Sequence, residues 1–355
     1  MAWHDTPLTR LLNIDYPIIQ APMAGATTPA MAAAAANAGA MGSLGCAMMG
    51  VGAMAAELRA AQAGTNRSLN VNFFVHARPV PDEDLNAEAA ARLAPWYDRL
   101  GAGEVKAPAD AIPTFDEAFC EAVIACGPTV ASFHFGLPGA ALVDRLKAAG
   151  ILILSSATSA EEARWLQDHG ADAIIAQGAE AGGHNGWFLP RRGADLTGTM
   201  ALVPRVVDAV RVPVVAAGGI ADGRGVAAAL MLGAAGVQVG TAFLATPECA
   251  SPEVHKQAVI AATGDDTMAT RAYSGRLARG IANDFSRDMA AHADWPDFPL
   301  MNVATGPIRA ASAGAGLPDA VALWSGQGAG LVRAETTAGV VTRLVAETEA
   351  ALSRV

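Results

Sequence analysis

Two neighbouring stretches decide the fold, VPVVAAGGIADGRGVAAAL at residues 212–230 and GVQVGTAFLATPE at residues 236–248. Each starts with a short apolar run, turns through glycine and continues into a helical pattern. Runs that are apolar on both faces are typical of parallel strands covered by helices. Glycine in both turns lets backbone N–H groups approach a bound phosphate, as occurs after the last two strands of (β/α)8 barrels.

Six further apolar runs of strand length precede these two. The eight expected strands cover residues 17–22, 40–45, 69–74, 129–133, 151–155, 173–177, 212–216 and 236–240. Helical patterns at 27–38, 138–149, 159–168 and 223–233 each end near a glycine. This alternation predicts an α/β protein with a (β/α)8 TIM barrel. The alternative, a doubly wound open sheet, carries its glycine loop after the first strand, whereas the strongest glycine turns here follow the last two.

Two long stretches interrupt the alternation. Residues 76–116 form a proline-containing connection after the third strand, and residues 247–320 exceed what one barrel helix needs. The second stretch holds a helical pattern near 252–263, then a polar segment and a Trp/Pro-rich turn. We therefore expect residues 1–246 and 321–355 to form the barrel, and residues 247–320 to form a small, mostly helical lid over its mouth.

The composition excludes several classes of protein. The 355 residues carry a formal net charge of −10 and only 5% aromatic residues, so we expect no nucleic acid partner. No apolar run is long enough to span a bilayer and no secretory signal pattern is present, so we expect no membrane contact and a cytoplasmic location. Four scattered cysteines without a C-x-x-C pair argue against a zinc ribbon or a disulfide framework.

The carboxyl ends of the expected strands carry amides, hydroxyls and glycines. In a barrel these ends face the active site. They lack the carboxylate pair of glycoside hydrolases and the His/carboxylate cluster of a metal site, so we expect no metal and a large hydrogen-bonding ligand. The polar and glycine residues at these ends are Gln20, Ser43, Asn72, Ser132, Ser155, Gln177, Gly218, Gly219, Gln238, Gly240 and Thr241.

One histidine stands out in the loop QGAEAGGHNG at residues 177–186. Glycines around His184 let the chain lie close to a planar ligand, and an imidazole can act as a base or a hydrogen-bond donor near neutral pH. His134, in SFHFG, follows the fourth strand and is either a second pocket residue or a structural histidine between two phenylalanines. The remaining histidines are interpreted as surface residues: His4, His76, His169, His255 and His292.

These segments together resemble the nitronate monooxygenase family, formerly called 2-nitropropane dioxygenases, which are FMN-dependent TIM barrels. The matching pieces are PIIQAPMAG (17–25), GAMGSLG (39–45), NVNFF (70–74), SFHFGLP (132–138), DAIIAQGAEAGGHNG (172–186), SGRLARGIAN (274–283), WSGQGAGL (324–331) and the two opening stretches. SFHFGLP together with AGGHNG is similar to the class I branch.

The resemblance implies a role for each matching residue. Pro22, Met23 and Ala24 would border the flavin. Asn72 and Gln177 would hydrogen-bond its ring or ribityl chain, and Gly182 and Gly183 would lie along it. The phosphate would be held by Gly218, Gly219, Gln238, Gly240 and Thr241. His184 matches the catalytic histidine, and His134, Ser132 and Arg276 are the expected substrate contacts.

Two residues depart from the class I pattern as it is usually met. Phe298 stands where a Tyr is common, and Gly306 stands where a Lys is common. Both belong to the expected lid, so substrate identity is affected rather than cofactor binding. Arg276, Arg279 or Lys256 could supply the missing positive charge.

The resemblance implies oxidation of alkyl nitronates, such as propionate-3-nitronate, by O2 to a carbonyl compound and nitrite. The expected partners are therefore a nitronate or nitroalkane and O2, and a homodimer is left open. Two other functions also stay open. One is an NAD(P)H-dependent FMN reductase of the enoyl-thioester or quinone reductase type, and the other is a catalytically silent flavin-binding protein.

Overall fold

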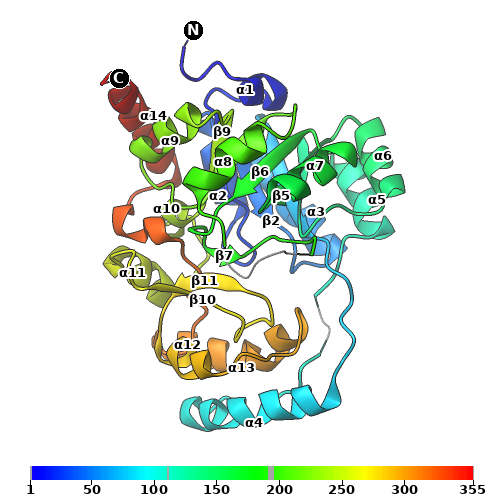
Figure 1. The fold of residues 1–355 in the computed structure, drawn as a ribbon, viewed down its shortest axis with the longest axis vertical. Coiled ribbons are helices and arrows are strands. Elements are labelled where there is room, and N and C mark those ends of the chain that lie inside the picture. The colour runs from blue at the N-terminus through cyan, green and yellow to red at the C-terminus, as the bar shows by residue number, and fades with distance from the viewer. Residues whose placement is uncertain (1, 110–111, 191–195, 355) are drawn as a thin grey trace.

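Eight parallel strands form the barrel in the computed structural model, which describes residues 2–109, 112–190 and 196–354 (Figure 1). In spatial order they run β1-β9-β8-β6-β5-β4-β3-β2. The ring closes between Ile19 and Met41, where Gln20 N donates to Met41 O at 2.9 Å. The predicted (β/α)8 barrel is confirmed, and the open-sheet alternative is wrong because β1 pairs on both of its edges.

The barrel strands match the apolar runs to within two residues at either end. They are β1 (Ile18–Gln20), β2 (Gly42–Gly45), β3 (Leu69–Phe74), β4 (Val130–His134), β5 (Leu152–Ala157), β6 (Ala173–Gln177), β8 (Val214–Ala217) and β9 (Gly236–Val239). Nearly all of their side chains are buried, because helices cover the outside and packed layers fill the inside.

Helices surround the strands. They are α2 (Pro29–Asn37), α3 (Val51–Gly64), α5 (Glu117–Cys126), α6 (Ala140–Ala148), α7 (Ala160–Asp168), α8 (Thr199–Val207), α9 (Gly223–Met231), α10 (Thr241–Leu244) and α14 (Thr337–Leu352). Side-chain oxygens begin several of them, as where Thr28 accepts from Met31 N and Ser159 accepts from Glu162 N. No helix in the described part of the chain is long and apolar enough to cross a membrane.

The helix α1 (Pro7–Leu12) seals one end of the barrel. Its Leu8 and Leu12 are fully buried and join the interior residues Ile19, Met41 and Leu154 in one apolar cluster. Figure 1 shows α1 at the end of the barrel opposite the yellow and orange lid elements. The carboxyl ends of the strands, at the opposite end, are therefore the end at which we expect a ligand to bind.

Besides the expected helices, residues 247–320 contain a β-hairpin, which the sequence pattern did not indicate. Its strands β10 (Thr267–Thr270) and β11 (Ala278–Ile281) lie in the segment that the sequence marks only as polar. The hairpin pairs with β7 (Gly183–His184) to make a three-stranded antiparallel sheet. The helical elements there are α11 (Glu253–Ala261), α12 (Asp284–Asp288), η1 (Met289–Ala291) and α13 (Leu300–Gly314), and η2 (Gln327–Leu331) follows.

A second apolar core joins the lid to a distant segment. Helix α4 (Glu83–Leu100), from the connection after β3, places Leu93 and Trp96 against Phe285 and Met301. Figure 1 shows α4 in cyan beneath α12 and α13, far from the barrel strands that flank it in sequence. A division into barrel and lid remains a proposal, and this packing would place α4 with the lid.

Candidate active site

His184 lies where the barrel loop after β6 meets the lid. Its strand β7 pairs with β11, so that His184 faces Ala278. The preceding Gly183 has a φ of +73°, a conformation that glycine adopts without a steric cost. The imidazole Nε2 lies 2.8 Å from Ser274 Oγ, a lid hydroxyl. The side chain is therefore held from both parts of the molecule.

Aromatic rings surround the imidazole. The ring centroid of His184 lies 5.2 Å from that of Phe298, 5.6 Å from Trp324 and 6.0 Å from Phe74. Burial lowers the pKa of His184 from 6.5 to about 3, and the positive charges nearby act in the same direction. His184 is therefore neutral at physiological pH. Its Nδ1 makes no hydrogen bond with any described residue, which leaves this atom for a ligand.

His134 holds the same loop from β4. Its Nε2 lies 3.1 Å from the carbonyl oxygen of His184, and its Nδ1 lies 3.0 Å from Ser156 Oγ. A carbonyl can only accept, so Nε2 carries the proton and Nδ1 accepts from the serine hydroxyl. Burial lowers the pKa of His134 from 6.5 to about 4. These contacts match the structural interpretation that the sequence left open.

Two more side chains fix the loop that carries His184. Gln177 donates from Nε2 to the His184 carbonyl at 2.9 Å and accepts from Gly186 N at 2.7 Å. Glu162 of α7 is buried and accepts from Phe188 N at 2.7 Å. The sequence predicted Gln177 as a flavin contact and gave no role to Glu162. In the structure both bind backbone atoms of the loop.

Arg276 lies beside this loop in the lid. Its guanidinium stacks 3.9 Å from the Phe135 ring centroid and 4.6 Å from that of Trp187. It donates to the carbonyl oxygens of Asn185 and Trp187. Burial lowers its pKa to about 10, and the carboxylates of Glu162 and Asp297 act in the opposite direction.

The two other cations proposed from sequence have different partners. Arg279 donates to Ala179 O at 2.9 Å and to Thr267 Oγ1, and Lys256 donates to Thr246 O at 3.0 Å. A further cation, Arg309 of α13, was missed. The signal that could have found it is an arginine one helical turn after the unexpected Gly306.

Backbone groups shape the predicted phosphate site. Gly218 and Gly219 have φ values of +114° and +72°. The N–H groups of Gly219 and Gly240 donate to no acceptor in the described ranges. The buried Oε1 of Gln238 also has no partner there. Free N–H groups suit phosphate oxygens and the amide oxygen suits a ligand hydroxyl or N–H, so these residues fit FMN.

Other predicted cofactor contacts lie around this phosphate site, which we call the phosphate cradle (Gly218, Gly219, Gln238 and Gly240). The backbone of Met23 and Ala24 lies so close to Gly45 that a Cβ atom on Gly45 would lie 2.5 Å from Ala24 N. Asn72 donates to Ser132 Oγ at 2.9 Å, and both side chains are buried. In this structure Ser132, an expected substrate contact, therefore contacts Asn72, an expected flavin contact.

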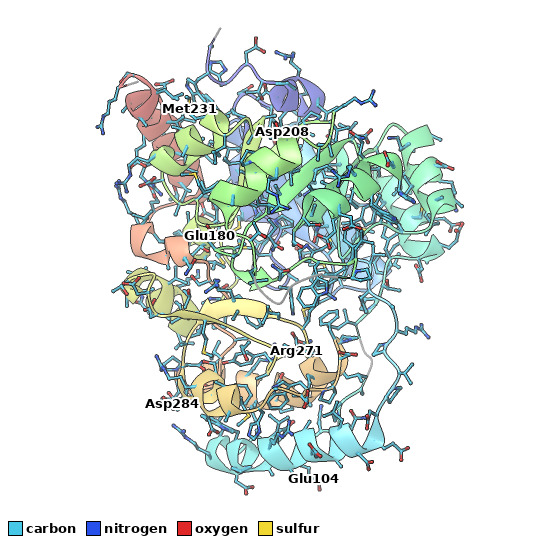
Figure 2. The ribbon with its side chains drawn as sticks, in the orientation of Figure 1. Glu104, Glu180, Asp208, Met231, Arg271 and Asp284 are labelled. Atoms are coloured by element: carbon cyan, nitrogen blue, oxygen red, sulfur yellow. The ribbon has the colours of Figure 1, made fainter. Side chains whose placement is uncertain are left out.

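The loop that follows the lid, residues 324–331, lies against the phosphate cradle. Thr241 Oγ1 accepts from Gly326 N at 2.9 Å, and a Cβ on Gly182 would lie 2.6 Å from the same nitrogen. Glu180, labelled in Figure 2 between barrel and lid, accepts from Thr199 N at 2.8 Å and so caps α8. Only glycine at 182 allows the two loops this approach.

One histidine interpreted as a surface residue is buried. His255 of α11 places Nε2 3.0 Å from Trp324 O, and burial lowers its pKa. The surface interpretation of His255 is therefore wrong. It positions the backbone of Trp324, one of the rings beside His184.

Comparison with known proteins agrees with this geometry. The family model described as nitronate monooxygenase matches residues 5–347. The chain belongs to the nitronate monooxygenase family. A curated relative, a probable nitronate monooxygenase of Staphylococcus aureus (strain Newman), is 40% identical over 329 residues and 92% of each chain.

Two solved structures share the fold over nearly the whole chain. Nitroalkane oxidase from Streptomyces ansochromogenes has a TM-score of 0.91 and 37% identity, covering 98% of this chain and 99% of its own. FabK from Thermotoga maritima has a TM-score of 0.75 and 27% identity, covering 98% and 97%. The family and the barrel make this protein an oxidoreductase that acts on nitronates in general.

Proposed function

We propose that this protein is an FMN-dependent nitronate monooxygenase that converts alkyl nitronates and O2 to a carbonyl compound and nitrite. One observation carries the proposal: His184 is neutral, is held through Nε2 by Ser274 and lies among aromatic rings, with the positive charges of Arg276 and Arg309 acting on it. An anionic nitronate gains from such positive charge in a site of low dielectric constant.

The cofactor would be held by the cradle described above. Gly218, Gly219, Gly240 and Thr241 would bind its phosphate, and Gln238 would accept from it. Pro22, Met23, Ala24, Gly182 and Gly183 would lie along the flavin. When bound, FMN would accept electrons from the substrate and pass them to O2.

The chain's own residues would position the substrate and move one proton. Ser274 can donate to His184 Nε2 or accept from it. Nδ1 can then either donate to a nitronate oxygen or remove the α-proton of a neutral nitroalkane. The rings of Phe74, Phe298 and Trp324 exclude water, which strengthens these interactions.

The test is aerobic nitrite release from ethylnitronate and propionate-3-nitronate. His184→Asn should keep FMN bound and lower turnover by about 10²–10⁴-fold, the range of a general acid or base. His169→Asn is the matched control, because His169 is exposed at the end of α7. Undiminished turnover in His184→Asn would reject the role given to His184.

The reductase alternative is kept because FabK shares the fold at 27% identity. Anaerobic mixing with NADH separates the two functions: prompt loss of flavin colour supports the reductase. A yellow protein that neither releases nitrite nor oxidises NAD(P)H would be a silent flavin-binding protein. O2 as co-substrate, a homodimer and a cytoplasmic location also remain proposals.

A further inference from the structure

Arg309 carries a buried positive charge near His184 that no described carboxylate neutralises. Its Nη2 donates to the carbonyl oxygen of Asn302 at 2.8 Å and to Asn302 Oδ1 at 3.1 Å. Its Nε is buried and has no acceptor among the described residues. A guanidinium removed from water normally has an anionic partner, because leaving it alone is costly.

The helix geometry explains how the guanidinium reaches this place. Side chains on a helix point back toward its N-terminus, so Arg309 of α13 reaches over the preceding turn. The residue there is Gly306, and a Cβ built on it would lie 3.9 Å from Arg309 Nη2. A longer side chain at position 306 would compete with the guanidinium for this space.

A continuous series of contacts connects helix α13, which carries Arg309, to the site. Thr305, one turn before Arg309, donates from Oγ1 to Tyr273 O at 2.6 Å. The Tyr273 ring lies 5.3 Å from that of Trp324, and the Trp324 ring lies 5.6 Å from that of His184. The charge of Arg309 also contributes to the lowered pKa of His184. Burial lowers the pKa of Arg309 itself. A substrate anion beside His184 would therefore lie within the field of Arg309.

We propose that Arg309 binds the anionic group of the substrate and that Gly306 is the residue that makes room for its guanidinium. The inference rests on the proposed function and assigns the site's specificity for anions to one side chain. Either a nitronate or a carboxylate presents the pair of oxygens that a guanidinium fork recognises. Arg276 differs, since its guanidinium is occupied by rings and backbone carbonyls.

The experiment compares Arg309→Met, Arg309→Lys and the control Arg287→Met, which removes an exposed arginine from α12. Arg309→Met should raise KM by about ten- to hundredfold, the range for a lost charge-assisted hydrogen bond, with kcat and FMN content little changed. Arg309→Lys should give a smaller rise. An effect on propionate-3-nitronate alone identifies the carboxylate as the bound group, and an equal effect on ethylnitronate identifies the nitronate.

Two further measurements separate a binding role from a structural one. Gly306→Lys combined with Arg309→Met should recover a low KM, because the lysine restores a cation one helical turn before position 309. The lysine should also not weaken the helix, since glycine is a poor helix former. Calorimetric titration with sodium nitrite should show binding to wild type and loss of binding in Arg309→Met. This readout needs no turnover, so it tests Arg309 even if no nitronate is oxidised.

An unchanged KM and an unchanged nitrite affinity in Arg309→Met would overturn the proposal. So would an equal loss in Arg287→Met. If Arg309→Met does not fold, Arg309→Lys and the double variant decide the question by the same measurements. Absence of nitrite release in wild type, with the nitrite affinity still dependent on Arg309, would instead reject the proposed function alone.

Discussion

Acid should destabilise this protein through His134, and the size of the effect follows from its surroundings. The pKa of His134 is lowered from 6.5 to about 4 in the folded protein, chiefly by burial. Below pH 6.5 the unfolded chain gains a proton that the folded chain refuses until about pH 4. The stability due to neutral His134 is thus complete above pH 6.5 and is lost as the pH falls toward 4. Near pH 4.5 the loss is about 2.5 kcal/mol, since each pH unit contributes about 1.36 kcal/mol.

His134→Gln removes the titration but keeps a donor and an acceptor. The free energy of unfolding would be measured by urea titration near pH 7 and near pH 4.5. Wild type should lose about 2.5 kcal/mol more than the variant between these conditions, while other buried histidines contribute equally to both proteins. His169→Gln, at an exposed position, should behave like wild type. Equal losses in wild type and His134→Gln would refute the assignment of a buried neutral imidazole.

Three further substitutions test the loops of the site. Glu162→Gln should lower the free energy of unfolding by about 1–3 kcal/mol, because an amide replaces a buried carboxylate that accepts from backbone N–H groups. Urea titration measures this loss, and an unchanged free energy would contradict the role given to Glu162. Gly182→Ala should weaken FMN binding, followed by flavin fluorescence, because its Cβ would meet the opposite loop at 2.6 Å; Gly139→Ala, with nothing within 4 Å, should not. Ser274→Ala should lower kcat about tenfold while FMN remains bound, because His184 Nε2 loses its partner, and an unchanged kcat would deny that role.

The barrel could be predicted because each strand has a recognisable pattern in consecutive residues. A run such as residues 173–177 is apolar on both faces, and a parallel strand buried between helices requires that pattern. The loop of His184 could be found for a similar reason, since glycines around one imidazole are a local signal. Both predictions depend on residues that are adjacent in sequence.

The lid could not be predicted to the same degree because its contacts join distant residues. The strand β7 has two residues and pairs with the four-residue β11, where His184 lies opposite Ala278, so neither strand shows an alternating pattern of useful length. The packing of α4 on α13 likewise joins distant segments, since Tyr97 Oη donates to Ala304 O, 207 positions later. Residue type also fails to separate roles: an amide such as Gln177 can bind a flavin or a backbone, and only the structure shows the second.

Oxidation of a nitronate by bound FMN is tested by mixing the purified protein anaerobically with ethylnitronate and following the flavin absorbance. We expect a yellow protein whose flavin absorbance falls when the nitronate is added, followed by nitrite release and recovery of the colour when air is admitted. A protein that responds to NADH but not to ethylnitronate would contradict it, and so would a colourless protein that cannot be reconstituted with FMN.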